Sequence, residues 1–285
     1  MAFAACRYGE LTAALPRIAA AAHATVDAAT GDQQREQAAS ALAHAYLVGS
    51  ELAIKGGRPT IAAMIADRAL THAREGGDAL TMAAGSRQVA IAMRREALAT
   101  PDLAARADGM TGAIRMLTST ALDLGADHGT PSKPVLGAYG SLLCTAGYSA
   151  AQLGHAHEAI GLLQEAEHAA ARAGTAPAFS ADTVAVYRVS VHTALGDPAT
   201  ALAHAQNVEP DRLPTTERRM RFYTDTARAW QQHGRIPEAA VALSQLARTA
   251  PEELRRPSVK TMIRTMRDAP GPTPSELAPL VSALD

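Results

Sequence analysis

Aromatic residues are scarce in this chain: they make up 4% of 285 residues, although hydrophobic residues make up 47%. Alanine therefore supplies much of the apolar content. Alanine favours closely packed α-helices, whereas strands are enriched in β-branched and aromatic residues. No stretch shows sustained alternation of polar and β-branched residues. The composition argues against a core built on sheets and predicts an all-α fold.

Cysteine is scarce as well. Cys6 and Cys144 are the only two cysteines, and they provide neither a disulfide framework nor the spacing of a metal site. A reduced, cytoplasmic setting is the simplest interpretation. The alanine-rich start is not typical of a signal peptide, because Arg7 and Glu10 precede its apolar part and Pro16 interrupts it.

Long apolar runs and an excess of charge of one sign are also missing. A membrane-spanning helix needs about 18 or more consecutive apolar residues, and the sequence contains no such run, so we expect no membrane span. The formal net charge is −1. This balance gives no electrostatic field that would attract nucleic acid to the whole protein.

The signatures of common catalytic sites are absent too. The sequence has no phosphate-binding P-loop, no nucleophile elbow, no His-Glu-x-x-His zinc motif and no convincing dinucleotide-binding glycine pattern. His155, His157 and Glu158 form the densest group of potential metal ligands, but they lie at an expected turn between helices, where such residues are ordinary solvated caps. We therefore expect no catalytic motif, no bound metal and no cofactor.

The sequence does contain a helical hairpin pattern, which is clearest from Met220 to Pro251. Ala227 and Trp230 take the small and aromatic positions of a first helix. Gly234 falls in the turn, and Ala239 begins the buried stripe of a second helix. Small, aromatic and proline residues at these places are typical of the tetratricopeptide repeat, with its period of about 34 residues. The small residues let two antiparallel helices pack closely.

The pattern recurs along the chain. A glycine followed five residues later by alanine appears at Gly57/Ala62, Gly154/Ala159 and Gly196/Ala201, and each pair continues into an apolar helical stripe. A degenerate hairpin is expected from about Asp78 to Gly125, and a capping helix from Pro257 to Arg267. We therefore predict a tetratricopeptide-like, right-handed helical solenoid of about five helix hairpins with a C-terminal capping helix. Residues 1–268 would form a single solenoid domain, and residues 269–285 a linker and a short C-terminal helix or tail.

Two segments carry a resemblance to a known family, namely Gly196–Trp230 and Ala250–Asp268. They resemble the C-terminal tetratricopeptide-like sensor region of bacterial Cro/repressor-type (Xre) helix-turn-helix regulators, common in antibiotic-producing filamentous bacteria. The resemblance implies an all-helical, regulator-like sensor region connected with bacterial secondary metabolism. The family's DNA-binding domain has no counterpart in this sequence, so we expect no direct nucleic-acid binding by this chain. Phe179–Val184 also departs from the family's Phe-Gly-Pro-Thr-Asn-Val segment, with Thr183 in place of an amide.

The most promising site is the concave face of the predicted array. In such arrays the first helix of each hairpin lines the inner surface, and the predicted registers place aromatic, apolar and cationic residues there, as a ligand site needs. The alternative is that the arginines pair with nearby acids such as Glu51 and Asp225, or face water. The candidate ligand-binding residues are His44, Glu51, Arg87, Ile91, Arg94, Ser141, Cys144, Tyr148, Thr183, Tyr187, Arg221, Thr224 and Arg228.

Three functions are compatible with this interpretation. The leading hypothesis is a non-enzymatic ligand-sensing protein that takes a small molecule or a short peptide in the groove. The second is a protein-interaction scaffold, with a protein partner or a homodimer. The third is a regulator-derived biosynthetic enzyme that promotes a cyclisation or rearrangement by enclosing its substrate, since catalysis by orientation leaves no sequence motif.

Overall fold

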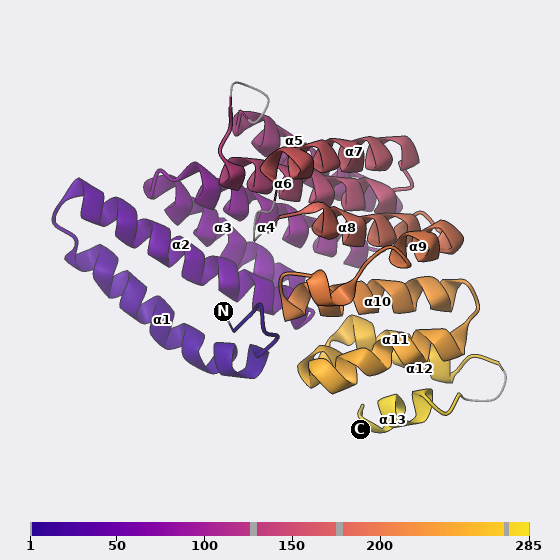
Figure 1. The fold of residues 1–285 in the computed structure, drawn as a ribbon. Helices are drawn as coiled ribbons and strands as arrows, with labels where there is room; N and C mark the ends of the chain where they lie inside the picture. Colours follow the sequence, from indigo (N-terminus) through magenta and orange to yellow (C-terminus); the bar gives the residue numbers. More distant parts are fainter. Residues whose placement is uncertain (1, 126–129, 175–178, 271–273, 285) are drawn as a thin grey trace. The chain divides into compact units, whose positions relative to one another are not determined.

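The structure is a computed structural model that describes residues 2–125, 130–174, 179–270 and 274–284 (Figure 1). Across these residues it contains thirteen α-helices and two short 3₁₀-helices, and no strand. The predicted all-α fold is therefore confirmed. Within the same residues, no helix has the length and apolar character needed to cross a membrane.

The helices follow one another with short connections. In chain order they are α1 (Tyr8–Ala28), α2 (Asp32–Lys55), α3 (Pro59–Glu75), α4 (Ala79–Ala99), α5 (Leu103–Asp123), α6 (Lys133–Gln152), α7 (Ala156–Ala173), α8 (Ala181–Ala194), α9 (Pro198–Ala205), η1 (Pro210–Arg212), α10 (Thr216–Gln232), α11 (Ile236–Thr249), η2 (Pro251–Arg255), α12 (Pro257–Arg267) and α13 (Leu277–Ser282).

The glycine–alanine pairs form four helical hairpins. The glycines adopt positive φ angles in the connections between helices, a backbone conformation that glycine reaches without steric cost. The alanines five residues later are fully buried at the start of the second helix, where a small side chain lets the two helices approach. The glycines are Gly57, Gly154, Gly196 and Gly234, with φ between 71° and 79°; the alanines are Ala62, Ala159, Ala201 and Ala239, each 0% exposed.

The hairpin between α4 and α5 turns without a glycine. Asp78 caps α4 by accepting a hydrogen bond from the Thr81 backbone N–H at 2.9 Å. Asp102 caps α5 in the same way, through the backbone N–H of Ala104 at 2.9 Å. Side-chain caps satisfy backbone donors that a helix start leaves without partners. The degenerate hairpin predicted between Asp78 and Gly125 is thus present as α4 and α5.

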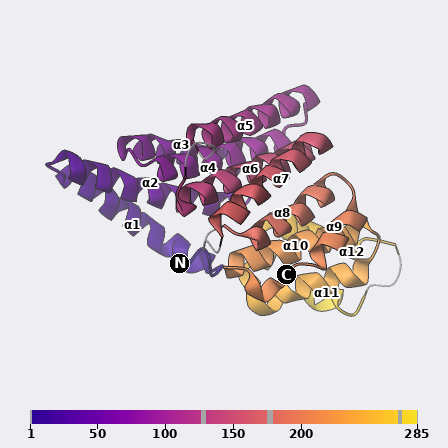
Figure 2. The ribbon, with the colours of Figure 1, turned by 45° about the horizontal axis from the view of Figure 1, so that its top comes forward.

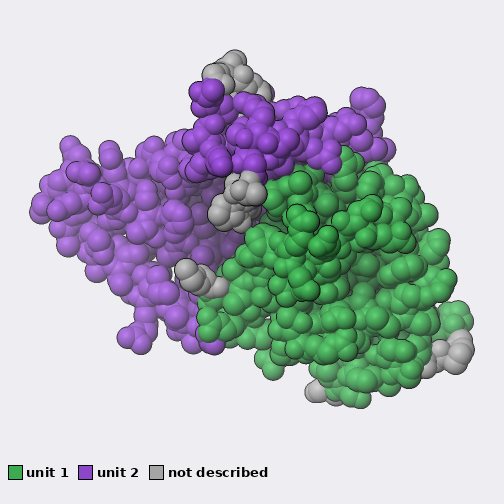
Figure 3. Space-filling model, in the orientation of Figure 1, with its two compact units in different colours: residues 1–9, 180–285 green, residues 10–179 purple. Residues whose placement is uncertain are grey.

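The chain divides into two compact units (Figure 3). Unit 1 combines residues 1–9 with residues 180–285, and unit 2 consists of residues 10–179. The chain therefore passes between the units twice. A division into compact units does not decide how many domains fold independently, so the single domain expected for residues 1–268 stays a prediction. In the predicted C-terminal segment, residues 271–273 and 285 lie outside the described residues.

In unit 2 each helix from α2 to α7 packs against the next (Figure 2). In addition, α2 contacts α4, and α4 contacts α6, so the first helices of successive hairpins lie against one another. The core is made mainly of alanine and leucine side chains. Its largest fully buried side chain is Phe179, which is 0% exposed and lies against Gly140 of α6.

Unit 1 follows the same order of contacts. The pairs α8/α9 and α10/α11 pack as hairpins, α8 contacts α10, and α10 contacts α12. The short helix α13 packs on α11 and α12 through Leu277 and Leu280, which are 0% and 2% exposed. Residues 2–9 also belong to this unit: the Glu217 backbone N–H donates to the Ala4 carbonyl at 2.9 Å.

Candidate functional site

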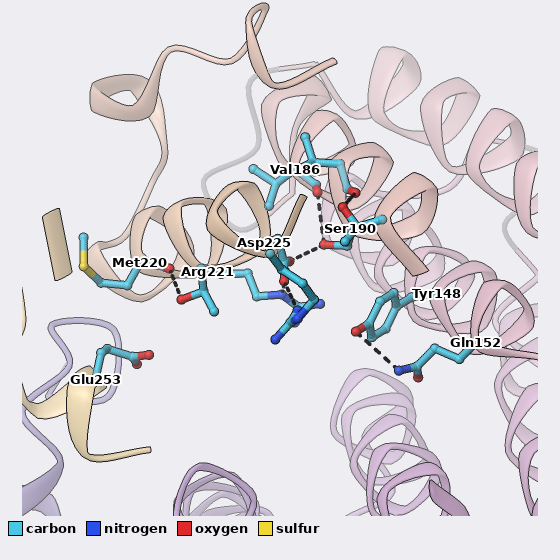
Figure 4. Close-up of polar contacts among 12 residues, drawn as sticks. Tyr148, Gln152, Val186, Ser190, Met220, Arg221, Asp225 and Glu253 are labelled. Carbon is cyan, nitrogen blue, oxygen red and sulfur yellow. Dashed lines mark hydrogen bonds and ion pairs between the residues drawn. The ribbon is translucent and has the colours of Figure 1, made fainter. Parts of the chain in front are cut away.

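A buried charged site in unit 1 surrounds Asp225 of α10. This carboxylate is 3% exposed. Arg221 donates to it from Nε at 2.8 Å, and Arg228 donates from Nη1 at 2.9 Å. The Ser190 hydroxyl of α8 donates to the same carboxylate (Figure 4). One acid is thus held by two arginines of its own helix and one hydroxyl of the facing helix.

Electrostatics keep Asp225 ionised. Burial on its own would raise the pKa of the Asp225 carboxyl, but the positive charges of Arg221 and Arg228 and the Ser190 hydrogen bond outweigh it, so the pKa lies below its ordinary value. Both Arg221 and Arg228 therefore pair with Asp225. This pairing was the alternative to ligand binding that the sequence left open.

An aromatic ring completes this cluster. Tyr187 of α8 is 4% exposed, and the guanidinium carbons of Arg218 and Arg221 lie 5.6 and 5.5 Å from its ring centroid. These distances are within the range of cation–π attraction. We call this cluster the α8–α10 face; its residues are Tyr187, Ser190, Arg218, Arg221, Asp225 and Arg228.

Of the two arginines that contact Asp225, Arg228 has the more exposed side chain. Its side chain is 31% exposed, compared with 24% for Arg221. A guanidinium has five N–H donors in a fixed fork, and the described residues take one of those of Arg228, through Asp225. The α8–α10 face can therefore offer hydrogen bonds and positive charge to an anionic group without losing its internal ion pair.

Two other candidate residues of unit 1 are buried. Thr224 is 2% exposed and donates its hydroxyl to the Met220 carbonyl at 2.8 Å. Thr183 is 1% exposed, and its hydroxyl has no hydrogen-bond partner among the described residues. Arg218 and Asp225 were not among the predicted site residues. The spacing of the sequence could have indicated Asp225, because it follows Arg221 by four residues and therefore shares its helical face.

In unit 2 the candidate arginines of α4 face polar side chains of α6. Arg87 donates from Nε to the Thr145 hydroxyl at 2.9 Å. Arg94 is 4% exposed and donates from Nη1 to the Ser149 hydroxyl at 3.2 Å. Its guanidinium carbon also lies 4.9 Å from the centroid of the Tyr148 ring. We call this cluster the α4–α6 face; its residues are Arg87, Arg94, Thr145, Tyr148, Ser149 and Gln152.

Three further candidates lie near this face. Ile91 is half-buried on α4 between the two arginines. The Ser141 carbonyl accepts a hydrogen bond from the Thr145 hydroxyl at 2.8 Å. Cys144 is 0% exposed, so its thiol belongs to the core.

The two candidates of α2 have different surroundings. His44 is exposed, and its Nδ1 lies 2.8 Å from the Ser40 carbonyl of its own helix. Glu51 is half-buried. The structure thus brings Arg87, Arg94 and Tyr148 together on the α4–α6 face, while His44 is engaged within α2.

In the part of the chain that the structure describes, no group of three or more His, Cys, Asp or Glu side chains is placed to hold a metal ion. His155 and Glu158 contact each other at 3.2 Å, with side chains 54% and 46% exposed. This is the geometry of a solvated pair at the start of α7.

Comparisons with known proteins assign the chain to no family. No protein-family model matches it, and no curated protein is significantly similar to it.

Proposed function

We propose that the chain is a tetratricopeptide-like helical solenoid of the kind found in the sensor regions of Xre-type regulators. Three observations support this proposal. From α2 to α7 in unit 2, and from α8 to α11 in unit 1, consecutive helices pack on one another. First helices contact one another, as α2 with α4 and α8 with α10. The second helices of four hairpins begin with a fully buried alanine, which is the close-packing position of the repeat.

We further propose that its function is non-enzymatic binding of a small molecule or short peptide that carries an anionic group. The α8–α10 face supplies the contact. The observation that carries the proposal is the unequal charge of this face: two arginines contact one carboxylate, and Arg228 keeps 31% of its side chain exposed. A carboxylate or phosphate can receive two parallel hydrogen bonds from such a guanidinium.

The internal ion pair supports this function as well. A free arginine on a helix surface samples many rotamers, and ordering it costs free energy when a ligand binds. Asp225 already fixes one end of the Arg228 guanidinium at 2.9 Å. Binding therefore requires less ordering, which is the usual advantage of a preorganised site.

The α4–α6 face is a second surface, in unit 2, that combines arginine, tyrosine and hydroxyl side chains. Arg94 is buried, held by Ser149 and stacked on Tyr148. The exposed edge of a tyrosine suits an apolar or ring portion of a ligand. By itself, this face is suited to contacts with a ring or an amide, because its arginines donate to hydroxyl groups of α6.

Native mass spectrometry tests the proposal. The protein should be purified under native conditions from the cells that produce it, alongside the Arg228→Ala variant. We expect wild-type protein to carry a bound molecule with a carboxylate or phosphate group, and the variant to lack it. A wild-type protein that carries no such molecule and instead co-purifies with a protein at fixed stoichiometry would contradict the proposal and favour the scaffold function.

A further inference from the structure

Unit 2 contains a groove that the proposed anion-binding function does not use. The groove has a volume of about 550 Å³ and is formed by α1, α2 and α3. Its walls are mainly apolar, and they include Leu15, Ala19, Tyr46, Leu52, Ile61 and Ile65. We call it the α1–α3 groove. Small-molecule sites in proteins commonly have volumes of about 300 to 1,000 Å³, apolar walls and a few polar groups.

Helix α1 forms one wall and packs weakly. Of its 21 residues, only Tyr8 at its first position is buried. Ile18 is 47% exposed, and on α3 Ile61 is 46% exposed. Most of the stability of a helix in a protein comes from packing of its apolar face. Leu15 and Ala19 of α1 line a groove that side chains of the described chain fill incompletely.

One end of the groove is fixed by a polar cluster. Tyr46 Oη lies 2.8 Å from Nε2 of His23, which joins α2 to α1. The Tyr46 ring also stacks on His72 of α3, with centroids 5.7 Å apart and an interplanar angle of 5°. His72 in turn contacts Glu75 at 2.7 Å. These contacts hold Tyr46 as a rigid wall that links all three helices.

The groove lining also carries one positive charge, away from the Tyr46 cluster. Of the described residues that line the groove, Arg58 is the one charged side chain. It is exposed and stands at the start of α3, as the residue before Pro59. An apolar groove with a single cation at its edge is complementary to an amphipathic anion.

We propose that the α1–α3 groove binds a small apolar organic acid. The apolar body would lie between Leu15 and Ala19 of α1 and Ile65 of α3, with its carboxylate at Arg58. A ligand in this position buries apolar surface of α1 that is otherwise wet, and so holds α1 against α2 and α3. The volume of the groove lies in the range of small-molecule sites, and its single lining cation matches one acid group.

Calorimetric titration with octanoate and with its neutral counterpart 1-octanol tests this site. The Ala19→Trp variant fills the groove from the α1 wall, and Ala20→Trp places the same side chain at the neighbouring exposed position as a matched control. We expect wild type to bind both probes. We expect Ala19→Trp to weaken both at least tenfold, and Ala20→Trp to change neither by more than about twofold.

Arg58→Gln tests the acid preference, with the exposed Arg68 of α3 as the control through Arg68→Gln. Because Arg58 is exposed, its ion pair is screened by solvent, and we expect about a threefold to fivefold loss of octanoate affinity. Binding of 1-octanol should not change. Equal effects of Arg58→Gln on the two probes would overturn the assignment to acids.

Folding and self-association complete the test. Thermal unfolding should show that each variant is folded. If Ala19→Trp does not fold, Ala53→Phe, which fills the groove from α2, takes its place. No binding of either probe to wild type, or equal binding to wild type and a folded groove-filled variant, would overturn the proposal. A dimer in light scattering that the groove-filling variant dissociates and Ala20→Trp does not would assign the groove to a second copy instead.

Discussion

At the scale of single residues, buried charges of this protein are compensated by their neighbours. An ionised carboxylate inside a protein loses hydration that only charge and hydrogen bonds can replace. Asp225 receives both from Arg221, Arg228 and Ser190. Glu253, which is 0% exposed, receives them from Arg256 and from the Tyr8 hydroxyl. Of these two acids, the one beside a partly exposed arginine is suited to ligand binding.

Replacement of Asp225 by asparagine should destabilise the protein by about 2–3 kcal/mol at pH 7, because Arg221 and Arg228 lose their charge-assisted hydrogen bonds to a buried carboxylate. The pKa of Asp225 is lowered on folding. Its contribution is therefore present above the unfolded pKa of about 3.9 and is lost as pH falls through the lower folded pKa. Urea unfolding at pH 7 and in the acid range measures this difference.

The exposed Asp211 provides the control for that comparison. Its side chain is 98% exposed and lies 3.7 Å from Arg219, so Asp211→Asn should change stability little at any pH. A penalty for Asp225→Asn that equals that of Asp211→Asn, or one that does not shrink in acid, would show that the Asp225 cluster is not a buried ion pair in solution.

Two tyrosine–glutamate contacts allow a second prediction. Tyr8 donates to the buried Glu253, whereas Tyr139 lies 3.5 Å from Glu165, whose side chain is 44% exposed. A hydrogen bond to a buried charge contributes about 1.5–3 kcal/mol. Tyr8→Phe should therefore lower the free energy of unfolding by about 2 kcal/mol, and Tyr139→Phe by much less. Chemical denaturation of both variants checks this order, and the reverse order would contradict the buried network.

At the scale of helices, the sequence predicts the hairpins more directly than the direction in which each side chain points. Four turns follow from glycine and alanine spacing, because a positive φ and a close helix crossing restrict the residue type strongly. The direction in which a side chain points is harder to predict. Adjacent residues of a helix are about 100° apart around its axis, so a small rotation of the helix moves a side chain from the groove into the core. Cys144, Thr183 and Thr224 were expected in the groove and are buried, whereas Arg218 was not expected in the site and lies over the Tyr187 ring.

Helix packing in unit 2 gives a third prediction. A Cβ on Gly140 of α6 would lie 2.2 Å from the ring of the fully buried Phe179, whereas a Cβ on Gly161 of α7 would meet nothing within 4 Å. Overpacking costs about 1–3 kcal/mol, and glycine to alanine in a helix gains about 1 kcal/mol. Gly140→Ala should therefore destabilise, and Gly161→Ala should stabilise. Thermal melts of the two variants measure the sign, and stabilisation by both would show that Phe179 does not pack on α6.

At the scale of the whole molecule, each end of the chain contributes to unit 1. Residues 2–9 pack with residues 180–285, through Ala4 with Glu217, Tyr8 with Glu253 and Gly9 with Glu252. No sequence pattern could have predicted these contacts. The two residues of each contact are more than 200 positions apart in the sequence, and no periodic pattern connects them.

Overall charge supports a fourth prediction. The chain has 27 basic and 28 acidic residues, and protein binding to DNA depends on an excess of cations that neutralise phosphates. We expect no specific binding of this chain to duplex DNA at physiological salt. Electrophoretic mobility shifts with promoter duplexes from its own gene cluster check this. A sequence-dependent shift would contradict it.

The central claim is that the α8–α10 face binds an anionic ligand through Arg228, and calorimetric titration of the co-purified ligand tests it most directly. Wild type should be compared with Arg228→Ala, with the charge-retaining Arg228→Lys, and with Arg264→Ala at an exposed position of α12. We expect Arg228→Ala to lose at least tenfold in affinity, Arg228→Lys to lose less because it keeps the charge without the fork, and Arg264→Ala to match wild type. Equal affinity of folded Arg228→Ala and wild type would contradict the claim.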